Sequence, residues 1–491
     1  MRTQSQTKTF TAKIKDIFWK QKGKLENFSL FIRNRKILFP LILGAAIRFS
    51  AAPFTEQRWD MYIWRLNQAF VYHYRINPFW PTQALEFAWG YPPLWLLTLL
   101  LVYPFYIILF PTSYPQEVSL LWNSYNSITD PQQRMATYFE SYWRFLPPPQ
   151  GNVQGLNLPI LDLIIKTPII ISDLIVALIL YKIVASLSNE KNAKYAYLAW
   201  LFNPYVIWIS SVWGMFDSIP TLFMLLSIYY LTKNNFYKSA IMLATSTLFK
   251  LYPALFIPIF TLIVFKKRRK FKEAIKFFLI SIGIIFSVIF VTYLAFAFYA
   301  GQEPLSLSIK LTYNIFVKRA SPDWEGRNII AGLTPLYFLS DKIGATNIPL
   351  SPLLISIALA LTLIKLGRQK ELTTEDILSY ATAAHFIIYL TYTVVNPQYF
   401  IWVLPLILIL AAEKNAKLKY LYWAVSIIPL SVIFCSYDLS YFFSPYFVSG
   451  YLKICISPEY FTESVALAIF YIACIKLAFI RKSSNQKTSK L

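Results

Sequence analysis

Long runs of apolar residues recur along this chain of 491 residues and constrain its fold more than any other feature. A helix needs about 20 mainly apolar residues, within a range of about 17 to 25, to cross the hydrocarbon core of a bilayer. Runs that meet or approach this length lie near 37–52, 167–187, 195–211, 216–232, 238–250, 251–265, 275–298, 350–366, 377–395, 399–412, 418–436 and 461–480. The sequence therefore predicts an all-α polytopic membrane protein with about 12 transmembrane helices.

The composition excludes the main alternatives to a membrane protein. Apolar residues make up 56% of the chain and charged residues only 14%, whereas soluble globular domains carry about 25% charged residues. The chain holds 47 Lys and Arg against 24 Asp and Glu, a net charge of +23. In a soluble protein such a surplus would indicate a nucleic-acid partner, so its distribution has to be considered first.

Most of the positive surplus falls in short segments that one topology places on the cytoplasmic side. They are the N-terminal tail, the loops NEKNAK, KNNFYK, KKRRKFKEAIK, KLGRQKE and EKNAKLK, and the C-terminal RKSSNQKTSK. Short cytoplasmic loops collect Lys and Arg, and acidic and basic residues nearly balance in the rest of the chain. The surplus therefore orients the protein with both termini inside, and no nucleic-acid partner is expected.

Whether the apolar run 94–110 crosses the membrane decides on which side the later loops lie. If it crossed alone, every later basic loop would move outside, so we expect an interfacial or re-entrant helix. A thirteenth span, or two further short spans within 94–165, is the alternative. The expected layout is a basic cytoplasmic tail at 1–36, a transmembrane domain at 37–480 and a second basic tail at 481–491. Large external segments then fall at 53–166 and 299–349.

Two smaller expectations concern the N-terminus and the cysteines. No small-residue cleavage site follows the first apolar run, so 37–52 is interpreted as a retained span rather than a signal peptide. Cys435, Cys455 and Cys474 lack CxxC spacing and are expected to act as small buried hydrophobic residues. A bridge between Cys435 and Cys455 in an external loop is the open alternative.

Polar residues that interrupt the apolar spans at their external ends are the first site candidates, because charges within membrane segments are costly. They are Asp173, Asp217, Lys250 and the group Asn396, Gln398 and Tyr399. Each has a plain structural reading as well. Asp217 can equally cap a helix, Lys250 can equally extend to the lipid head groups, and Asp173 can pair with Lys166 or Lys250.

The start of the first external segment supplies a second group of candidates. Glu56 and Asp60 follow the first span directly, where a carboxylate can act as general base toward a hydroxyl arriving from the water. Arg58 and Arg65 could hold a phosphate there. The alternative is an ordinary solvated loop with salt bridges. Of the two histidines, His385 is expected to pack within a helix and His73 to lie at the interface.

Five segments, in this order, resemble one family of membrane enzymes. They are GYPPLWLLTLL at 90–100, IIISDLIVALILY at 169–181, FNPYVIWISSVWGMFDSIPTLFML at 202–225, FKLYPALFIP at 249–258 and NPQYFIWVLPL at 396–406. Together they resemble the motifs of PIG-M, the catalytic subunit family of GPI mannosyltransferase I. More broadly they resemble glycosyltransferases of the GT-C fold, which use dolichyl-phosphate-linked sugars. The resemblance covers roughly residues 37–410.

The resemblance implies an inverting glycosyltransferase with a long first external loop that carries amphipathic helices. Its site would lie on the external or lumenal face, and the acidic catalytic residue would fall on Asp60, with Glu56 as the alternative. PIG-M carries a DxD at this point, whereas this chain does not. The WGMFDS segment is also closer to that of dolichyl-phosphate-glucose glucosyltransferases. These departures leave the sugar and the acceptor open.

The sequence-based hypothesis is transfer of a hexose, with mannose preferred, from a polyprenyl phosphate to a lipid-linked glycan or glycolipid. Asp60 would deprotonate the acceptor. Candidates to neutralise the phosphate are Lys250, Arg58 and Arg327, while Asp173 and Asp217 would shape the pocket or bind sugar hydroxyls, and Gln398 and Tyr399 would add substrate contacts. Trp59, Trp213 and Tyr91 are candidates for stacking against sugar or prenyl groups. No metal or other cofactor is expected, and the membrane is that of a prokaryotic cell or of the endoplasmic reticulum.

Two rival functions remain open at this stage. A polytopic transporter or lipid-linked sugar flippase would place its ionisable groups near the bilayer midplane, often in repeated halves, and no repeat is visible here. A non-catalytic subunit would fit if the candidate side chains pointed apart. The arrangement of Asp60, Asp173, Asp217 and Lys250 therefore discriminates between these functions.

Overall fold

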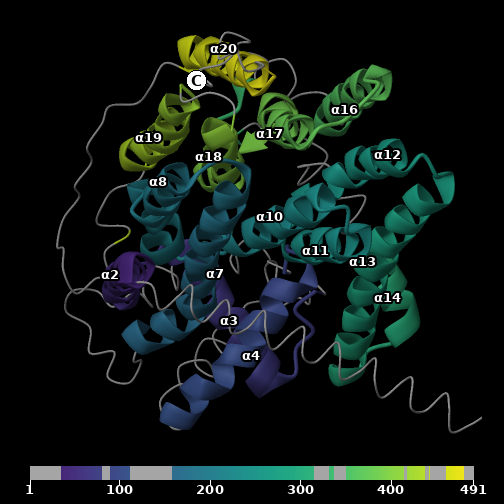
Figure 1. Ribbon diagram of the computed structural model, residues 1–491. Coiled ribbons are helices and arrows are strands. Elements are labelled where there is room, and N and C mark those ends of the chain that lie inside the picture. Colours follow the sequence, from purple (N-terminus) through teal and green to yellow (C-terminus); the bar gives the residue numbers. More distant parts are fainter. Residues whose placement is uncertain are drawn as a thin grey trace, which may run out of the picture. The chain divides into compact units, whose positions relative to one another are not determined.

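The computed structural model describes residues 35–79, 89–110, 158–313, 331–336, 350–413, 417–436, 442 and 460–479 (Figure 1). The chain divides into a short unit, Met1–Ile47, and a large unit, Arg48–Leu491. Helix α2 (Arg35–Ala51) begins in the first unit and ends in the second. The site described below lies entirely within the large unit.

The described residues are almost entirely helical, which confirms the predicted all-α class. The helices before residue 300 that follow α2 are α3 (Arg58–Tyr74), α4 (Pro93–Leu109), α7 (Leu158–Leu187), α8 (Glu190–Leu201), α9 (Pro204–Ile207), α10 (Ser218–Thr232), α11 (Phe236–Phe249), α12 (Phe256–Arg268) and α13 (Phe271–Tyr299). The later ones are α14 (Pro304–Tyr313), α16 (Leu350–Arg368), α17 (Thr374–Thr391), α18 (Leu404–Glu413), α19 (Leu418–Ser436) and α20 (Tyr460–Ala478). Short helical turns join them: η1 (Ala52–Phe54), the π-helical η2 (Trp208–Trp213), η3 (Tyr252–Leu255) and η6 (Pro397–Trp402).

Most predicted spans coincide with one helix, and those at 251–265 and 399–412 with two successive helical pieces. The span predicted at 195–211 is divided among α8, α9 and η2, and the one predicted at 377–395 runs past the end of α17 at Thr391. Within the described residues, four helical stretches are long and apolar enough to cross a membrane: Arg35–Phe54, Pro159–Leu187, Phe271–Tyr299 and Leu350–Arg368. Shorter apolar helices accompany them. The protein is thus a multi-pass membrane protein, and the count of 12 spans and the side on which each loop lies stay predictions.

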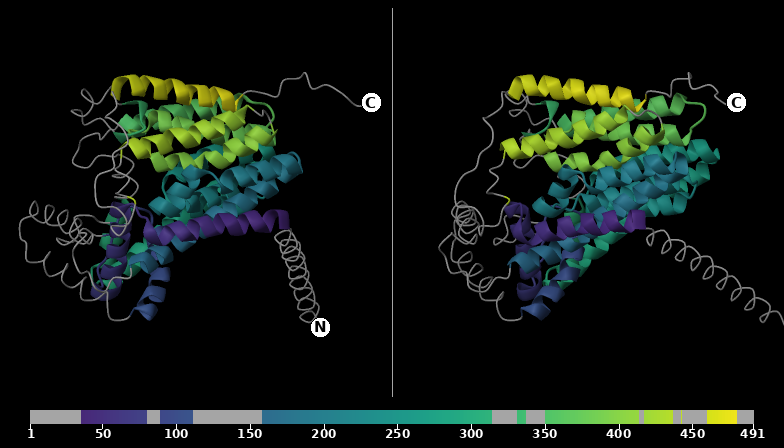
Figure 2. Two further views of the ribbon diagram at one scale, coloured as in Figure 1. Left: turned by 90° about the vertical axis from the view of Figure 1, so that its left-hand side faces the viewer. Right: turned by 60° about the vertical axis from the view of Figure 1, so that its left-hand side comes forward.

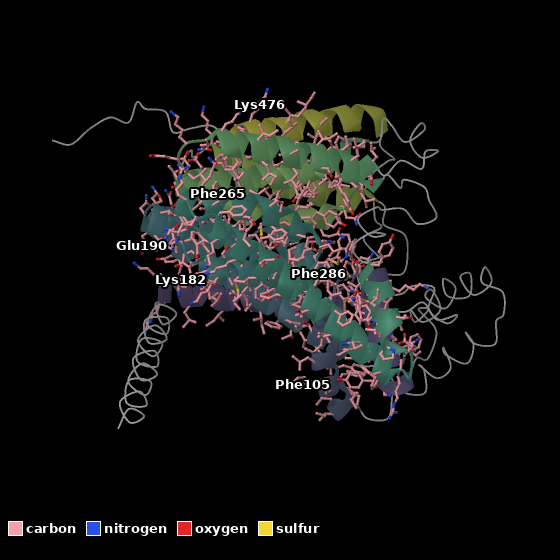
Figure 3. The ribbon with its side chains drawn as sticks, turned by 90° about the vertical axis from the view of Figure 1, so that its right-hand side faces the viewer. Phe105, Lys182, Glu190, Phe265, Phe286 and Lys476 are labelled. Atoms are coloured by element: carbon pink, nitrogen blue, oxygen red, sulfur yellow. The ribbon has the colours of Figure 1, made fainter. Side chains whose placement is uncertain are left out.

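Large apolar side chains on the outside of these helices agree with a lipid environment. On α13, Leu279 and Val291 are 59% and 60% exposed, and Phe286 also faces outward (Figure 3). A soluble protein rarely presents such a continuous apolar surface. In a bilayer these side chains would instead contact acyl chains.

Helix α7 is the centre of the large unit and packs against α4, α8, α10 and α18 (Figure 1). It begins at Leu158, within the segment predicted to be external, so its first turns precede the apolar span. Around it, α10 packs on α11 and α11 on α13. Helices α17, α18, α19 and α20 lie alongside one another (Figure 2).

Helix α4 corresponds to the ambiguous run 94–110. It packs against α3, where Gln68 Nε2 donates to the Leu99 carbonyl at 2.7 Å and the Tyr72 hydroxyl to the Leu100 carbonyl at 2.6 Å. Its outer face leaves Leu101 and Ile108 more than 70% exposed. With 17 residues it is at the lower limit for a span. The interfacial or re-entrant placement stays a prediction.

A short strand pair links the second external segment to the residues before the last motif. Strands β1 (Ala331–Gly332) and β2 (Val394–Val395) pair in parallel, and the Leu333 amide donates to the Val395 carbonyl at 2.6 Å. The Thr334 hydroxyl donates to the Tyr392 carbonyl at 2.8 Å. Part of the segment 299–349 is thereby fixed next to η6.

Candidate active site

The WGMFDS motif forms a sharp turn that delivers Asp217 to the interior. The π-helix η2 ends at Gly214, whose φ of +84° is a left-handed conformation that favours glycine. Asp217 then occupies the N-cap position of α10, but its side chain makes no capping hydrogen bond. The helix-cap interpretation of Asp217 is therefore wrong, because its carboxylate is used elsewhere.

Asp217 forms a buried ion pair with Lys250. The Lys250 Nζ lies 2.7 Å from Asp217 Oδ1, and both side chains are almost fully buried. The Trp402 indole N–H donates to the same oxygen at 2.5 Å, while Asp217 Oδ2 has no hydrogen-bond partner among the described residues. Lys250 does not extend to the lipid head groups, so the snorkelling interpretation is wrong as well.

Aromatic rings surround the Lys250 ammonium. Its Nζ lies 4.7 Å from the centroid of the Tyr399 ring and 5.2 Å from that of Trp402. The rings of Phe216 and Tyr91 follow at 5.5 and 5.9 Å. Such rings attract a cation through their negative faces. Among the described residues the ammonium donates to Asp217 alone, which leaves two of its three hydrogens for a ligand.

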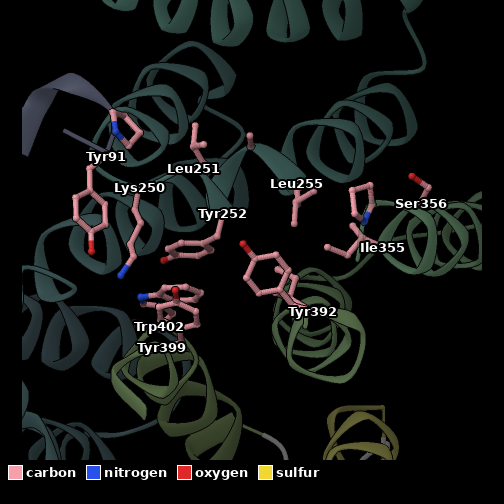
Figure 4. Close-up of a pocket in the computed structure, with 15 residues that line it drawn as sticks. Tyr91, Lys250, Leu251, Tyr252, Leu255, Ile355, Ser356, Tyr392, Tyr399 and Trp402 are labelled. Atoms are coloured by element: carbon pink, nitrogen blue, oxygen red, sulfur yellow. The ribbon is translucent and has the colours of Figure 1, made fainter. Parts of the chain in front are cut away.

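Three aromatic rings stack next to this cation. Tyr252 lies parallel to Trp402, with ring centroids 3.6 Å apart and an interplanar angle of 4°. Tyr399 covers the other face of Trp402 at 4.4 Å and 18° (Figure 4). The stack joins η3 to η6, which lie far apart in the sequence. It forms one wall of the pocket described next.

The pocket has a volume of about 400 Å³ and is polar at one end. Lys250 and Tyr91 lie at the polar end (Figure 4). The aromatic stack separates this end from the opposite, apolar end, which is formed by η3, α16 and α17. The apolar and aromatic lining residues are Tyr91, Pro92, Leu251, Tyr252, Ala254, Leu255, Pro352, Ile355, Ile388, Tyr392, Tyr399 and Trp402. The space can hold an anionic group next to a hydrophobic chain.

Asp60 lies in the first turn of α3, close to this ion pair. Its backbone N–H donates to Gln57 Oε1 at 2.7 Å, which caps the helix, and its Oδ2 accepts from the Trp213 indole N–H at 2.9 Å. Burial raises the pKa of Asp60 to about 6, Trp213 and Lys250 lower it, and the nearby Asp217 carboxylate raises it. Asp60, Asp217 and Lys250 therefore form one electrostatically coupled group. We refer to them as the site triad.

Glu56 belongs to a different, closed cluster. Its Oε2 accepts from Arg65 Nη2 at 2.7 Å, and Arg65 Nη1 donates to Asp162 Oδ1 at 2.7 Å. All three side chains are buried. The alternative reading of this segment as an ordinary solvated loop with salt bridges is thus right about the salt bridges, but they are buried rather than solvated. Arg65 is committed to two carboxylates, and the expectation that it holds a phosphate is not supported.

Asp173 is also committed to the protein interior. It has no exposed surface, and its carboxylate accepts from Arg48 Nε at 2.6 Å, from the Trp200 indole N–H at 2.7 Å and from the Ser210 hydroxyl at 2.9 Å. The ion-pair partner is Arg48 rather than Lys166 or Lys250. This arrangement leaves no face for a sugar hydroxyl, so Asp173 connects α2, α7 and α8 instead of binding substrate.

The remaining candidates divide between the pocket and its surroundings. Tyr399 lines the pocket. Gln398 is buried outside its lining, and its Oε1 has no partner among the described residues. Arg327 and the side chains of Arg58 and Trp59 lie outside the described residues, as does the proposed Cys435–Cys455 bridge.

Other sequence expectations concern the histidines and metal ions. His385 is buried in α17 with Nδ1 2.8 Å from the Ala381 carbonyl, which confirms its role in helix packing. His73 Nε2 lies 3.1 Å from the Tyr103 hydroxyl. Among the described residues, no three His, Cys, Asp or Glu side chains lie together as a metal site.

The chain has partial similarity to known proteins of glycosylphosphatidylinositol (GPI) biosynthesis. It is 38% identical to GPI mannosyltransferase 1 of Candida albicans over 96 residues, which are 19% of this chain and 24% of that relative. The resemblance to GPI mannosyltransferase 1 is confirmed. The Saccharomyces cerevisiae enzyme of the same name is 30% identical over 120 residues, 24% of this chain and 30% of the relative. The chain therefore covers less than a third of either relative's length.

A second match comes from a family described as GPI transamidase subunit PIG-U. It covers residues 144–324, a range that includes Asp217 and Lys250 but neither Asp60 nor Tyr399. Both comparisons relate the chain to membrane proteins of GPI synthesis or attachment. They agree with the family resemblance derived from the five motifs.

Proposed function

We propose that the chain is an inverting membrane glycosyltransferase that transfers a hexose, preferably mannose, from a polyprenyl phosphate to a lipid-linked glycan or glycolipid. The observation that carries this proposal is the site triad, two carboxylates and a cation, whose Lys250 lines the aromatic pocket. The similarity to GPI mannosyltransferase 1 supports the choice of mannose. The reaction would take place on the external or lumenal face.

The donor fits the pocket by charge and by polarity. A phosphate at the polar end would receive hydrogen bonds from the Lys250 ammonium, while the prenyl chain would extend past Leu255 and Ile355. Asp217 holds the ammonium in place at 2.7 Å. Because a phosphate is a good leaving group, positioning it and neutralising its charge are the main requirements.

The acceptor hydroxyl would be activated by Asp60. Its oxygen attacks the anomeric carbon as the bond from that carbon to the phosphate oxygen breaks, and the electron pair leaves on the phosphate. The hydroxyl proton passes to Asp60. A base with a pKa of about 6 is largely ionised at neutral pH and still accepts a proton effectively. The Asp217 Oδ2, which has no partner among the described residues, and the aromatic stack that lines the pocket are available to bind the sugar.

Glu56 is a weaker candidate for this step. Arg65 occupies its carboxylate at 2.7 Å, and the side chain is buried away from solvent. A base must reach the proton that it removes. Asp60 remains partly exposed and therefore fits the role better.

A subunit role without transfer chemistry is the second candidate, favoured by the match to a GPI transamidase subunit family. In such a subunit the triad would have no reason to converge beside a pocket. A transporter or flippase is less well supported, because the curated relatives are named as mannosyltransferases. The similarity to proteins of the GPI pathway also favours the endoplasmic reticulum membrane over a prokaryotic cell membrane.

The test is transfer from defined donors by the purified protein in lipid nanodiscs. We expect label from dolichyl-phosphate mannose, and less from dolichyl-phosphate glucose, to reach a lipid-linked acceptor. Asp60→Asn should lower the rate by about 10²–10⁴-fold without loss of folded protein, while Lys182→Met on the exposed face of α7 should match the wild type. Full activity of Asp60→Asn would remove Asp60 from the mechanism, and Glu56→Gln would be tested next. No transfer from any donor would favour the subunit role.

A further inference from the structure

Lys166, which the proposed reaction does not use, is fully buried in the third turn of α7. Its ammonium contacts four backbone carbonyl oxygens rather than a carboxylate. The Ala52 carbonyl lies 3.0 Å from its Nζ, that of Ser211 2.9 Å, that of Val212 3.4 Å and that of Thr55 closer still, so the three hydrogens of the ammonium are shared among four acceptors. A buried ammonium with hydrogen-bond partners on every side has a structural or functional reason to be there.

These carbonyls come from two segments that are far apart in the sequence. Ala52 and Thr55 belong to the turn between α2 and α3, and Ser211 and Val212 belong to the π-helix η2. The last carbonyls of a helix lack intrahelical partners and carry partial negative charge, so a cation is favoured there. Lys166 therefore joins the two segments through one cation.

Further hydrogen bonds connect the same two segments. The Thr55 hydroxyl lies 3.3 Å from the Ser211 carbonyl. The Gln57 amide donates to the Trp213 carbonyl at 2.9 Å, and the Trp213 indole donates to Asp60. The first segment leads directly into Asp60, and the second leads through Gly214 into Asp217.

We propose that Lys166 is a positioning residue that fixes the distance between Asp60 and the Asp217–Lys250 pair. It would do so by holding the η1–α3 turn against η2. The structural part of this proposal stands independently, whereas its kinetic part rests on the proposed glycosyl transfer.

The glycine at position 214 shows how closely Lys166 is fitted. A Cβ added to Gly214 would lie 2.7 Å from Lys166 Cε and 3.0 Å from Met61 Sδ. Lys166 cannot yield easily, because its ammonium is held by four carbonyls. The lysine stem therefore packs directly beneath the turn that carries Asp217.

A role as a counter-charge for the nearby acidic cluster explains less of the geometry. Glu56 and Asp162 both form their ion pairs with Arg65. Lys166 makes no ion pair with either carboxylate among the described residues, and its direct partners are carbonyls. Removal of Lys166 should consequently loosen two backbone segments rather than free a carboxylate.

The experiment compares Lys166→Met with Lys182→Met, a matched lysine on the exposed face of the same helix. Hydrogen exchange by mass spectrometry on the nanodisc-embedded protein follows peptides over 52–60 and 208–217. We expect exchange in both peptides to accelerate by about tenfold or more in Lys166→Met, with peptides of α11 and α13 unchanged. Lys182→Met should leave every peptide unchanged.

The kinetic part is measured on the same proteins. Misplacement of reacting groups by about 1 Å costs roughly 10²-fold in rate, so kcat should fall by about that factor in Lys166→Met with little change in KM. The acid limb of the pH profile of kcat/KM should also move to lower pH, because water that reaches the Asp60 carboxylate would lower its pKa. Trp213, Lys250 and Asp217, which act on Asp60 from other elements, are chemically unchanged in this variant. A merely stabilising lysine would not move this limb.

Each result decides the proposal. Unchanged exchange in 52–60 and 208–217, or exchange that rises equally throughout the chain, overturns the positioning role. If Lys166→Met does not fold, Thr55→Val removes the hydroxyl contacts to the Ser211 and Ala51 carbonyls and keeps Lys166, and a smaller rise confined to the same two peptides is expected. If the wild type transfers no sugar, the proposed function fails while the exchange data still decide the role of Lys166.

Discussion

The Asp217–Lys250 ion pair offers a test that separates stability from catalysis. The perturbation is a cycle of three variants: Asp217→Asn, Lys250→Met and the two combined. Asn retains an acceptor for the Trp402 indole, and Met retains most of the lysine stem. Each single variant therefore removes one charge with little loss of volume and leaves the other charge buried without its partner.

The expected magnitudes follow from the burial of the pair. The two side chains are 0% and 8% exposed, and their charged atoms are 2.7 Å apart. Breaking such a buried pair typically costs about 3–5 kcal/mol, whereas replacing both partners can be nearly neutral. We expect each single variant to lose about 3–5 kcal/mol of unfolding free energy. The double variant should lose about 1 kcal/mol, the usual net value of one hydrogen bond.

The assay is denaturant unfolding in detergent micelles, followed by tryptophan fluorescence, together with transfer activity per folded molecule. The order of stability should be wild type, double variant and then the single variants. Activity should not return in the double variant, because Lys250 is proposed to hold the phosphate. Additive losses, with the double variant least stable, would refute the reasoning that the pair is a closed electrostatic unit.

Three further predictions address other parts of the site. The transfer rate kcat/KM should rise as the pH increases through about 6 and level off above it, because burial raises the pKa of Asp60 and only its ionised form is a base; rates between about pH 5 and 8 test this. Gly214→Ala should destabilise the protein by about 2–4 kcal/mol, from its positive φ and its contact with Lys166. Gly367→Ala is the control: an added Cβ there would meet nothing within 4 Å, so the melting temperature should not fall. Asp173→Asn should cost about 3–5 kcal/mol yet keep the activity per folded molecule, and a specific loss of activity would place Asp173 back in the site.

The helices could be predicted from the sequence because the length of an apolar run is a local property. Most predicted spans correspond to one helix, as in α13, and the others to successive helical pieces. The break between α11 and η3 falls at the predicted boundary between 238–250 and 251–265. The break at Asn203 lies inside the span predicted at 195–211 and is not predicted, because Pro204 begins a new helical turn within a run that looks continuous in hydropathy.

Part of the site could be predicted for a related reason. Asp217, Lys250 and Tyr399 were selected because they interrupt apolar segments, and a buried charge must find a partner. Their convergence with Asp60 required the fold. The pairing of Arg48 with Asp173, and of Arg65 with Glu56 and Asp162, could not be predicted. Pairing across long sequence distances leaves no local pattern.

The aromatic stack and the lysine beneath it illustrate what could not be predicted. Trp402 and Tyr252 belong to motifs, but with 14 Trp and 34 Tyr in the chain no single ring could be selected. The sequence indicates Lys166 only as a possible partner for Asp173. Its actual partners are backbone carbonyls, which every residue has, so only the arrangement of η2 reveals them.

The Arg48–Asp173 pair also has a consequence for how the protein is made. The two residues are 125 positions apart in the chain, and at about 5–20 residues per second a ribosome needs about 6–25 seconds to synthesise the interval. During that time the first membrane helix holds a guanidinium without its carboxylate. Insertion of α2 is therefore provisional until α7 emerges, and we expect truncated chains that end before α7 to be the ones that quality control removes.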